Sequence, residues 1–184
     1  MDWLAANSKR ISEDSTPNFV FAHLVAPHPP FFLDNTCSTV VEHGRAGSQF
    51  NQPGIERSTR DDFFFEQKTC IDSFLIELAD LIQPNDVVIF VGDHGTDRRN
   101  QLAMPPEEWS RQAIVERMNV LVAVRTGNGC SIGDNIVIPN LLRRVLSCFS
   151  ASQLEDGASR MFIGTASELN STEVLDLLGP SPAE

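Results

Sequence analysis

An acid and an imidazole, Asp93 and His94, stand side by side at the end of an apolar, β-branched run that covers residues 87–91. Both side chains can ligate a metal ion. Neighbours in a strand point to opposite faces, so the two can meet at one ion only where the strand gives way to a loop, and Gly92 and Gly95 permit that change. We therefore predict that Asp93 and His94 ligate a divalent metal ion. The plainer alternative is a simple turn after the strand.

A second imidazole, His28, follows another apolar run, residues 18–26, which predicts a buried strand. The surrounding Pro27, Pro29 and Pro30 hold it in a stiff loop. If both strands belong to one sheet, His28 can contact a bound oxyanion or protonate its leaving group beside the metal ion. This combination indicates a phosphate or sulfate ester as substrate, with His28 as the catalytic residue. The alternative is a surface histidine in a proline turn.

Further candidates for substrate binding are Arg98 and His23. Guanidinium groups make paired hydrogen bonds to oxyanions, although at least one of Arg98 and Arg99 is expected only to cap a helix or solvate a loop. His23 lies inside the strand pattern, where a satisfied core histidine is as reasonable as a substrate contact. Asp and His suit Zn and Mn, whereas Ca or Mg would need more oxygen ligands, so the identity of the metal is left open.

The composition excludes some partners. The chain has 25 acidic and 14 basic residues, a net charge of -11, so binding to a nucleic acid is not expected. An anionic substrate would need a metal ion or local cations against that charge. No apolar run approaches the roughly 20 residues of a membrane span, and the N-terminus lacks a secretory pattern. As given, the chain is expected to be soluble.

The pattern of elements predicts an α/β fold in which helices flank a mostly parallel sheet, because strand, helix and strand follow in crossover order. Residues 1–17 read as a polar lead-in, and 34–60 as a loop without regular structure. The expected strands are 18–26, 87–91, 118–124 and 161–163, and the expected helices are 61–82, 107–116, one from Asp134 or Asn135 to Phe149, and 172–178. Residues 151–184 form a tail.

The four cysteines, Cys37, Cys70, Cys130 and Cys148, have no CxxC spacing, which argues against a zinc ribbon or a thioredoxin-type motif. Disulfides are left open. Cys70 and Cys148 lie in helical patterns, and buried thiols are the favoured interpretation for both.

Several segments carry a resemblance to a known family. Residues 19–31, FVFAHLVAPHPPF, resemble the sulfatase-family segment in which a buried strand leads to a His-x-Pro loop, and VVIFVGDHG resembles that family's metal-binding strand. The helix between them is similar too, with Asp72 at its acidic position. Residues 116–121 and 136–149 are similar to the tail of sulfatase-like membrane hydrolases and transferases, which include lipoteichoic acid synthases and phosphoethanolamine transferases. The resemblance covers residues 17–150.

The resemblance implies that residues 18–150 are part of an alkaline-phosphatase-like α/β sandwich, with Asp93 and His94 as metal ligands and His28 as an oxyanion contact. In that superfamily the nucleophile and another acidic metal ligand precede the segment that begins at Phe19. We therefore expect the C-terminal part of a phosphate- or sulfate-ester hydrolase or transferase, without a nucleophile, inactive alone and completed by a missing N-terminal half. Cys37 follows His28 in the chain, so it does not fit the family's modified-cysteine motif.

Location follows only from the family, whose membrane-associated members act in the periplasm or otherwise outside the cytoplasm. The rival interpretation is a degenerate sulfatase-like module that binds a metal ion, an anion or a protein partner without turnover. A third is a chance Asp-His pair in a plain structural domain.

Overall fold

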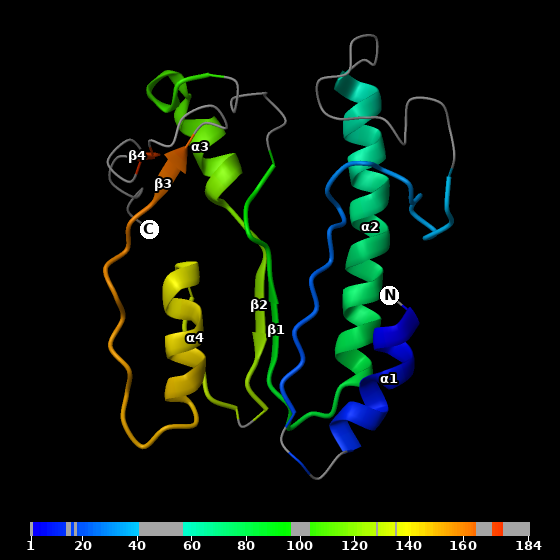
Figure 1. The fold of residues 1–184 in the computed structure, drawn as a ribbon, viewed down its shortest axis with the longest axis vertical. Helices are drawn as coiled ribbons and strands as arrows, with labels where there is room; N and C mark the ends of the chain where they lie inside the picture. The colour runs from blue at the N-terminus through cyan, green and yellow to red at the C-terminus, as the bar shows by residue number, and fades with distance from the viewer. Residues whose placement is uncertain are drawn as a thin grey trace. The chain divides into compact units, whose positions relative to one another are not determined.

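The computed structural model describes residues 2–13, 16, 18–40, 57–96, 104–127, 129–134, 136–164 and 171–174. It divides into two compact units, residues 1–84 and 85–184. The first unit contains α1 (Asp2–Glu13) and α2 (Arg57–Leu81). The second contains β1 (Val88–Val91), η2 (Pro106–Glu108), α3 (Arg111–Met118), β2 (Val122–Arg125), α4 (Ile138–Ser147), β3 (Phe162–Gly164) and β4 (Ser171–Glu173) (Figure 1). None of the helices in these described ranges combines the length and apolar character that a bilayer span requires.

Helix α2 is the scaffold of the first unit, and it confirms the predicted helix at 61–82. Its buried positions, Phe64, Ile71, Phe74 and Leu78, recur at the spacing that places side chains on one helix face. The lead-in also differs from expectation, because residues 2–13 form α1, which lies beside the C-terminal half of α2 (Figure 1).

The core of the first unit forms where residues 31–33 cover α2. Phe31 is fully buried, and its ring meets the ring of Phe64 edge to face at a centroid distance of 6.2 Å. Next to it, Leu33 packs with Cys70 and Ile71. This short extended segment therefore joins the loop that carries His28 to the helix.

The predicted strand at 18–26 is absent. A strand needs a neighbour that exchanges backbone hydrogen bonds with it, and no ladder in the described part of the chain includes these residues. Phe19 and Phe21 are 91% and 81% exposed within this structure, so the segment is not a buried strand. Its apolar, β-branched composition indicated a strand, but composition does not supply a partner.

The expected mostly parallel sheet, and with it the alkaline-phosphatase-like α/β sandwich, is wrong. In the described residues β1 pairs with β2 in antiparallel register, from Val88 opposite Arg125 to Val91 opposite Val122. Strands β3 and β4 form a second small antiparallel pair. The physical reason is that the chain leaving β1 folds back through η2 and α3, so β2 enters the ladder from the opposite direction. The order of β1, α3, β2 and α4 was predicted correctly, but order does not determine strand direction.

The second unit has its own apolar core, in which Trp109, Ala113 and Ile114 pack against Ile163 and Val174. Strands β3 and β4 thereby cover η2 and α3. The predicted helix at 172–178 is therefore wrong where it is described, because residues 171–173 form β4, and residues 175–178 lie outside the described part.

The remaining elements of the second unit follow the sequence pattern with shifted ends. The predicted helix at 107–116 is divided into η2 and α3, since the Ser110 side chain caps α3 by accepting from Ala113 N at 3.2 Å. Strand β2 begins later than predicted because α3 continues to Met118. Helix α4 has Pro139 in its first turn, as expected, and β3 lies within one residue of the predicted 161–163 strand.

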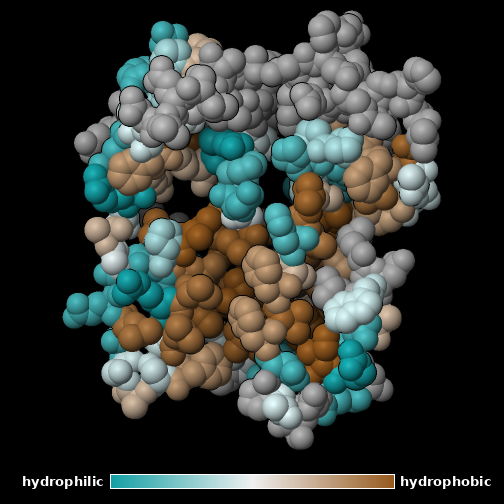
Figure 2. Space-filling view, viewed as in Figure 1, coloured by the Kyte–Doolittle hydropathy of each residue, from teal (hydrophilic) through white to brown (hydrophobic). Residues whose placement is uncertain are grey.

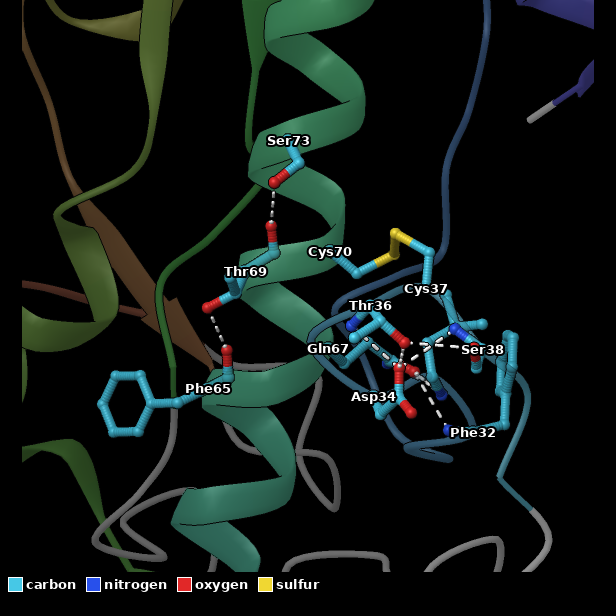
Figure 3. The surroundings of a disulfide bond; sticks show 11 residues. Phe32, Asp34, Thr36, Cys37, Ser38, Phe65, Gln67, Thr69, Cys70 and Ser73 are labelled. Carbon is cyan, nitrogen blue, oxygen red and sulfur yellow. Dashed lines mark hydrogen bonds between the residues drawn. A yellow bond between two sulfur atoms is a disulfide. The ribbon is translucent and has the colours of Figure 1, made fainter.

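Both cysteine pairs form disulfides, Cys37–Cys70 in the first unit and Cys130–Cys148 in the second. The expectation of buried thiols at Cys70 and Cys148 is therefore wrong. Cys37 reaches α2 from a turn in which Asp34 Oδ1 accepts hydrogen bonds from Thr36 N at 2.8 Å and Ser38 N at 3.0 Å (Figure 3). Separations of 33 and 18 residues follow no short motif, so the sequence alone could not pair these cysteines.

Removal of the Cys37–Cys70 bond by the double change Cys37→Ser, Cys70→Ser should destabilise the first unit. In the chain-entropy view the cross-link restricts the unfolded chain, and a loop of this length is worth about 3–4 kcal/mol. Urea unfolding should show an earlier transition, and dithiothreitol, which also reduces Cys130–Cys148, should shift the wild-type protein at least as far. An unchanged unfolding midpoint in the double variant contradicts this role.

Two surface ion pairs should make stability fall in acid. Hydrogen bonds from Arg144 hold the pKa of Asp156 below its ordinary 3.8, and hydrogen bonds from Arg160 lower the pKa of Glu173 in the same way. A lowered folded-state pKa stabilises the protein above the unfolded-state pKa, and this stabilisation is lost as pH falls through the folded value. Thermal melts from neutral pH into acid should therefore show a smaller decrease for Asp156→Asn and Glu173→Gln than for the wild type. Equal decreases would contradict the two pairings.

Candidate functional site

Backbone hydrogen bonds hold the Asp93–His94 segment at both ends. Beyond β1, Gly92 N donates to Leu121 O at 2.9 Å, and Gly95 N donates to Arg117 O at 2.7 Å. These bonds tie the segment to the chain that leaves α3 and enters β2. The pair therefore stands on the ordered end of the β1–β2 ladder.

The second glycine is required by packing. A Cβ built on Gly95 would lie 1.9 Å from Glu116 O and 3.0 Å from Arg117 O, closer than any side chain can approach backbone oxygens. A Cβ on Gly92 would instead find ordinary contacts, the nearest at 3.6 Å. Gly95 is thus required for the close approach of the two backbones, whereas Gly92 is not.

The acid and the imidazole face each other at the surface. His94 Nε2 lies 3.6 Å from Asp93 Oδ2, and the two side chains are 41% and 82% exposed. The other carboxylate oxygen, Asp93 Oδ1, accepts a hydrogen bond from His94 N at 2.9 Å. The local turn therefore overcomes the strand alternation that would have separated the two side chains.

This geometry suits two ligands of one ion. Ligand atoms about 2.1 Å from a metal ion at a tetrahedral angle lie roughly 3.4 Å apart, close to the observed 3.6 Å. His94 Nδ1 is 2.9 Å from Gly95 O, and a histidine that gives its Nδ1 proton to a carbonyl presents Nε2 to a metal. Within the described ranges no group of three or more His, Cys, Asp or Glu residues converges, so the described protein ligands are these two.

An arginine that sequence reasoning did not assign lies against the pair. Arg117 Nη1, from the last turn of α3, donates to Gly95 O at 2.8 Å and lies 2.9 Å from His94 Nδ1. A guanidinium group only donates hydrogen bonds, so His94 Nδ1 must accept when this contact forms. The segment at 116–121 was recognised only for its resemblance, and nothing in its spacing indicated contact with a residue 23 positions earlier.

The predicted histidines of the first unit are both exposed. His23 lies in the extended segment before the prolines and is not a core histidine. His28 N donates to Val25 O at 2.9 Å, and its ring Nδ1 lies 2.6 Å from Pro29 O. Its backbone carbonyl accepts from Gln67 Nε2 at 3.2 Å. His28 therefore stands in a loop with defined hydrogen bonds, in the first unit, whereas Asp93 and His94 belong to the second.

The other candidates are less informative. Arg98 and Arg99 lie outside the described residues. Asp72, the acidic position on α2 noted in the family resemblance, forms an ion pair with Lys68 one turn away on the same helix. An exposed pair of this kind is a common feature of helix surfaces and does not by itself indicate a site.

Comparison of the chain with protein-family models, curated proteins and solved structures found no match. The resemblance to sulfatase-like enzymes therefore depends only on the segments of sequence described above.

Replacement of Gly95 by alanine should separate the Asp93–His94 segment from α3. The added methyl group meets Glu116 O, so the segment must shift, at a cost of roughly 1–3 kcal/mol in unfolding free energy. Chemical denaturation measures that cost, and NMR signals of the His94 ring report the loss of its contact with Arg117. Gly157→Ala is the matched control in the same unit, because the nearest atom to its Cβ would be Asn140 Oδ1 at an ordinary 3.5 Å. Equal effects of the two changes would refute the packing argument.

Proposed function

We propose that this chain provides metal-binding and oxyanion-binding residues for the cleavage or transfer of phosphate or sulfate esters, in the manner of sulfatase-like hydrolases and transferases. The observation that carries the proposal is the 3.6 Å separation of His94 Nε2 and Asp93 Oδ2 on an exposed turn. The position of Gly95 O supports it, because this carbonyl can accept the Nδ1 proton of a His94 ring that ligates through Nε2, in place of the contact with Arg117. Zn, Mn, Ca and Mg are all compatible with the proposal.

Each residue has a distinct chemical task in this proposal. A bound divalent ion would polarise the ester and help to activate a hydroxyl nucleophile. Asp93 and His94 hold that ion, and the guanidinium of Arg117 places a positive charge beside them that suits an oxyanion. His28 belongs to the first unit and is proposed separately as an oxyanion contact. No residue named in this site is assigned as the nucleophile, and Arg98 and His23 remain candidates for binding the substrate.

A second candidate function is a module that binds a metal ion, an anion or a protein partner without turnover. It is favoured by one observation: the described residues bring together only two metal-ligating side chains from the Asp93–His94 turn and no third. Such a site leaves most of the coordination sphere to water or to oxygens of the bound anion.

Calorimetric titration of the full chain with Mn²⁺ and with Zn²⁺ tests the proposal. Asp93→Asn and His94→Gln should each weaken binding at least about tenfold, because each removes one of two protein ligands. Glu155→Gln, a change at an exposed carboxylate of the same unit, should leave binding unchanged. Equal affinities for the wild type and both site variants would refute the metal site.

Turnover separates the two candidate functions. With the metal that binds, the wild-type chain is incubated with p-nitrophenyl phosphate and p-nitrophenyl sulfate. Hydrolysis that disappears in Asp93→Asn supports an enzyme. Hydrolysis by the wild-type chain would therefore rule out the binding module, whereas metal binding without hydrolysis is expected both of the module and of a chain that supplies no nucleophile.

A further inference from the structure

Gln67 is a polar side chain with no exposed surface, on the face of α2 that meets residues 28–33. Burial of a side-chain amide is costly unless its donor and acceptor groups find partners. Its Oε1 accepts from Phe32 N at 3.0 Å and from Leu33 N at 3.2 Å, and its Nε2 donates to His28 O at 3.2 Å. Figure 3 shows the side chain directed at the backbone of this loop.

The bonds of Gln67 bridge the two ends of the proline loop. Donation to His28 O fixes the beginning, and acceptance from Phe32 N and Leu33 N fixes the end. A carboxamide accepts two such bonds at its oxygen and donates from its nitrogen, so it can serve both ends of the loop without a change of protonation. Leucine of similar size can do neither. A glutamate can accept, but it can donate to His28 O only when protonated.

Hydrogen bonds therefore hold the backbone of His28 at both its amide and its carbonyl group. Its amide donates to Val25 O at 2.9 Å, and its carbonyl receives the amide of Gln67. The ring Nδ1 lies 2.6 Å from Pro29 O, and since a carbonyl only accepts, Nδ1 carries the proton in this contact. Nε2 is then the ring atom left for a ligand, and His28 is exposed.

A covalent link reinforces this arrangement. Cys70 follows Gln67 by three positions on α2, so the two side chains lie on the same face of the helix. The disulfide from Cys70 to Cys37 holds the next turn of the loop against that face (Figure 3). Gln67 thus meets the segment nearest His28, and the disulfide meets the segment beyond Leu33.

We propose that Gln67 is a positioning residue for His28. It fixes the peptide that carries the imidazole and thereby directs Nε2 toward the oxyanion of a phosphate or sulfate ester. The oxyanion contact rests on the proposed function, whereas the positioning of the ring is a property of the first unit alone. Gln67 itself touches backbone and is not a catalytic residue.

The test uses the full chain labelled with ¹⁵N-histidine, with Gln67→Leu and Gln67→Glu as variants. In the wild type, the ring nitrogens of His28 should show the tautomer protonated at Nδ1, and the amides of Phe32 and Leu33 should exchange slowly. Both variants should lose this tautomer preference near neutral pH, and Gln67→Leu should also lose the slow exchange. Ser73→Ala is the control, because it removes only the bond from Ser73 Oγ to Thr69 O on the exposed side of the same helix.

The glutamate variant gives a signature that general destabilisation would not give. Burial raises the pKa of a carboxyl group, so Glu at this position should become protonated above the usual value of about 4.3 and then donate to His28 O. Acidification should therefore return the backbone carbonyl carbon signal of His28 toward that of the wild type at the same pH, because the protonated carboxyl group again donates to His28 O. A His28 ring spectrum that is identical in the wild type and both variants at every pH overturns the proposal.

Titration with inorganic phosphate and with sulfate separates this inference from the proposed function. In the wild type these anions should shift the His28 ring signals, and in Gln67→Leu the anion concentration needed should rise about tenfold. If neither anion shifts the wild-type signals, the oxyanion role fails. The tautomer and exchange measurements then still decide whether Gln67 positions the ring.

Discussion

The hydrogen bond from Gly95 N to Arg117 O is the constraint on which the candidate site depends. It brings the backbone after β1 so close to the end of α3 that a single added Cβ would lie 1.9 Å from Glu116 O. Because the turn is held there, Asp93 and His94 can face each other instead of alternating across a strand. The same closeness brings Arg117 to the imidazole. The facing of Asp93 and His94 and the position of Arg117 beside them thus both depend on this backbone contact.

Local patterns predicted much of the secondary structure and little of its assembly. The periodicity of residues 61–82 and the apolar run at 87–91 identified α2 and β1, since both signals are carried by neighbouring residues. The direction of strand pairing depends on how a connection of many residues folds, and no short pattern records it. The segment at 18–26 shows the same limit: its residues favour a strand, but a strand exists only with a partner, and in the described residues none pairs with it.

The same distinction between local pattern and long-range contact separates the candidate residues that the sequence identified from those that it missed. Asp93, His94 and His28 were found from residue type and from position after apolar runs. Arg117 and Gln67 were not, because each meets its partner across a long stretch of chain, and isolated arginines and glutamines on helices are ordinary. The sequence pointed to Arg117 and Gln67 only indirectly. Gln67 stands three residues before a cysteine on the apolar side of α2, and Arg117 lies in the last turn of a short helix, inside one of the resembling segments.

Arg117 and a metal ion make incompatible demands on His94. The guanidinium can hydrogen bond to Nδ1 only when that nitrogen carries no proton, whereas a neutral imidazole that ligates an ion through Nε2 carries its proton on Nδ1 and donates it to Gly95 O. Occupation of Nε2 by an ion therefore breaks the Arg117–His94 contact. In a chain with a net charge of -11, a guanidinium released from the ring beside a bound cation is a local attraction for an oxyanion that the overall charge repels.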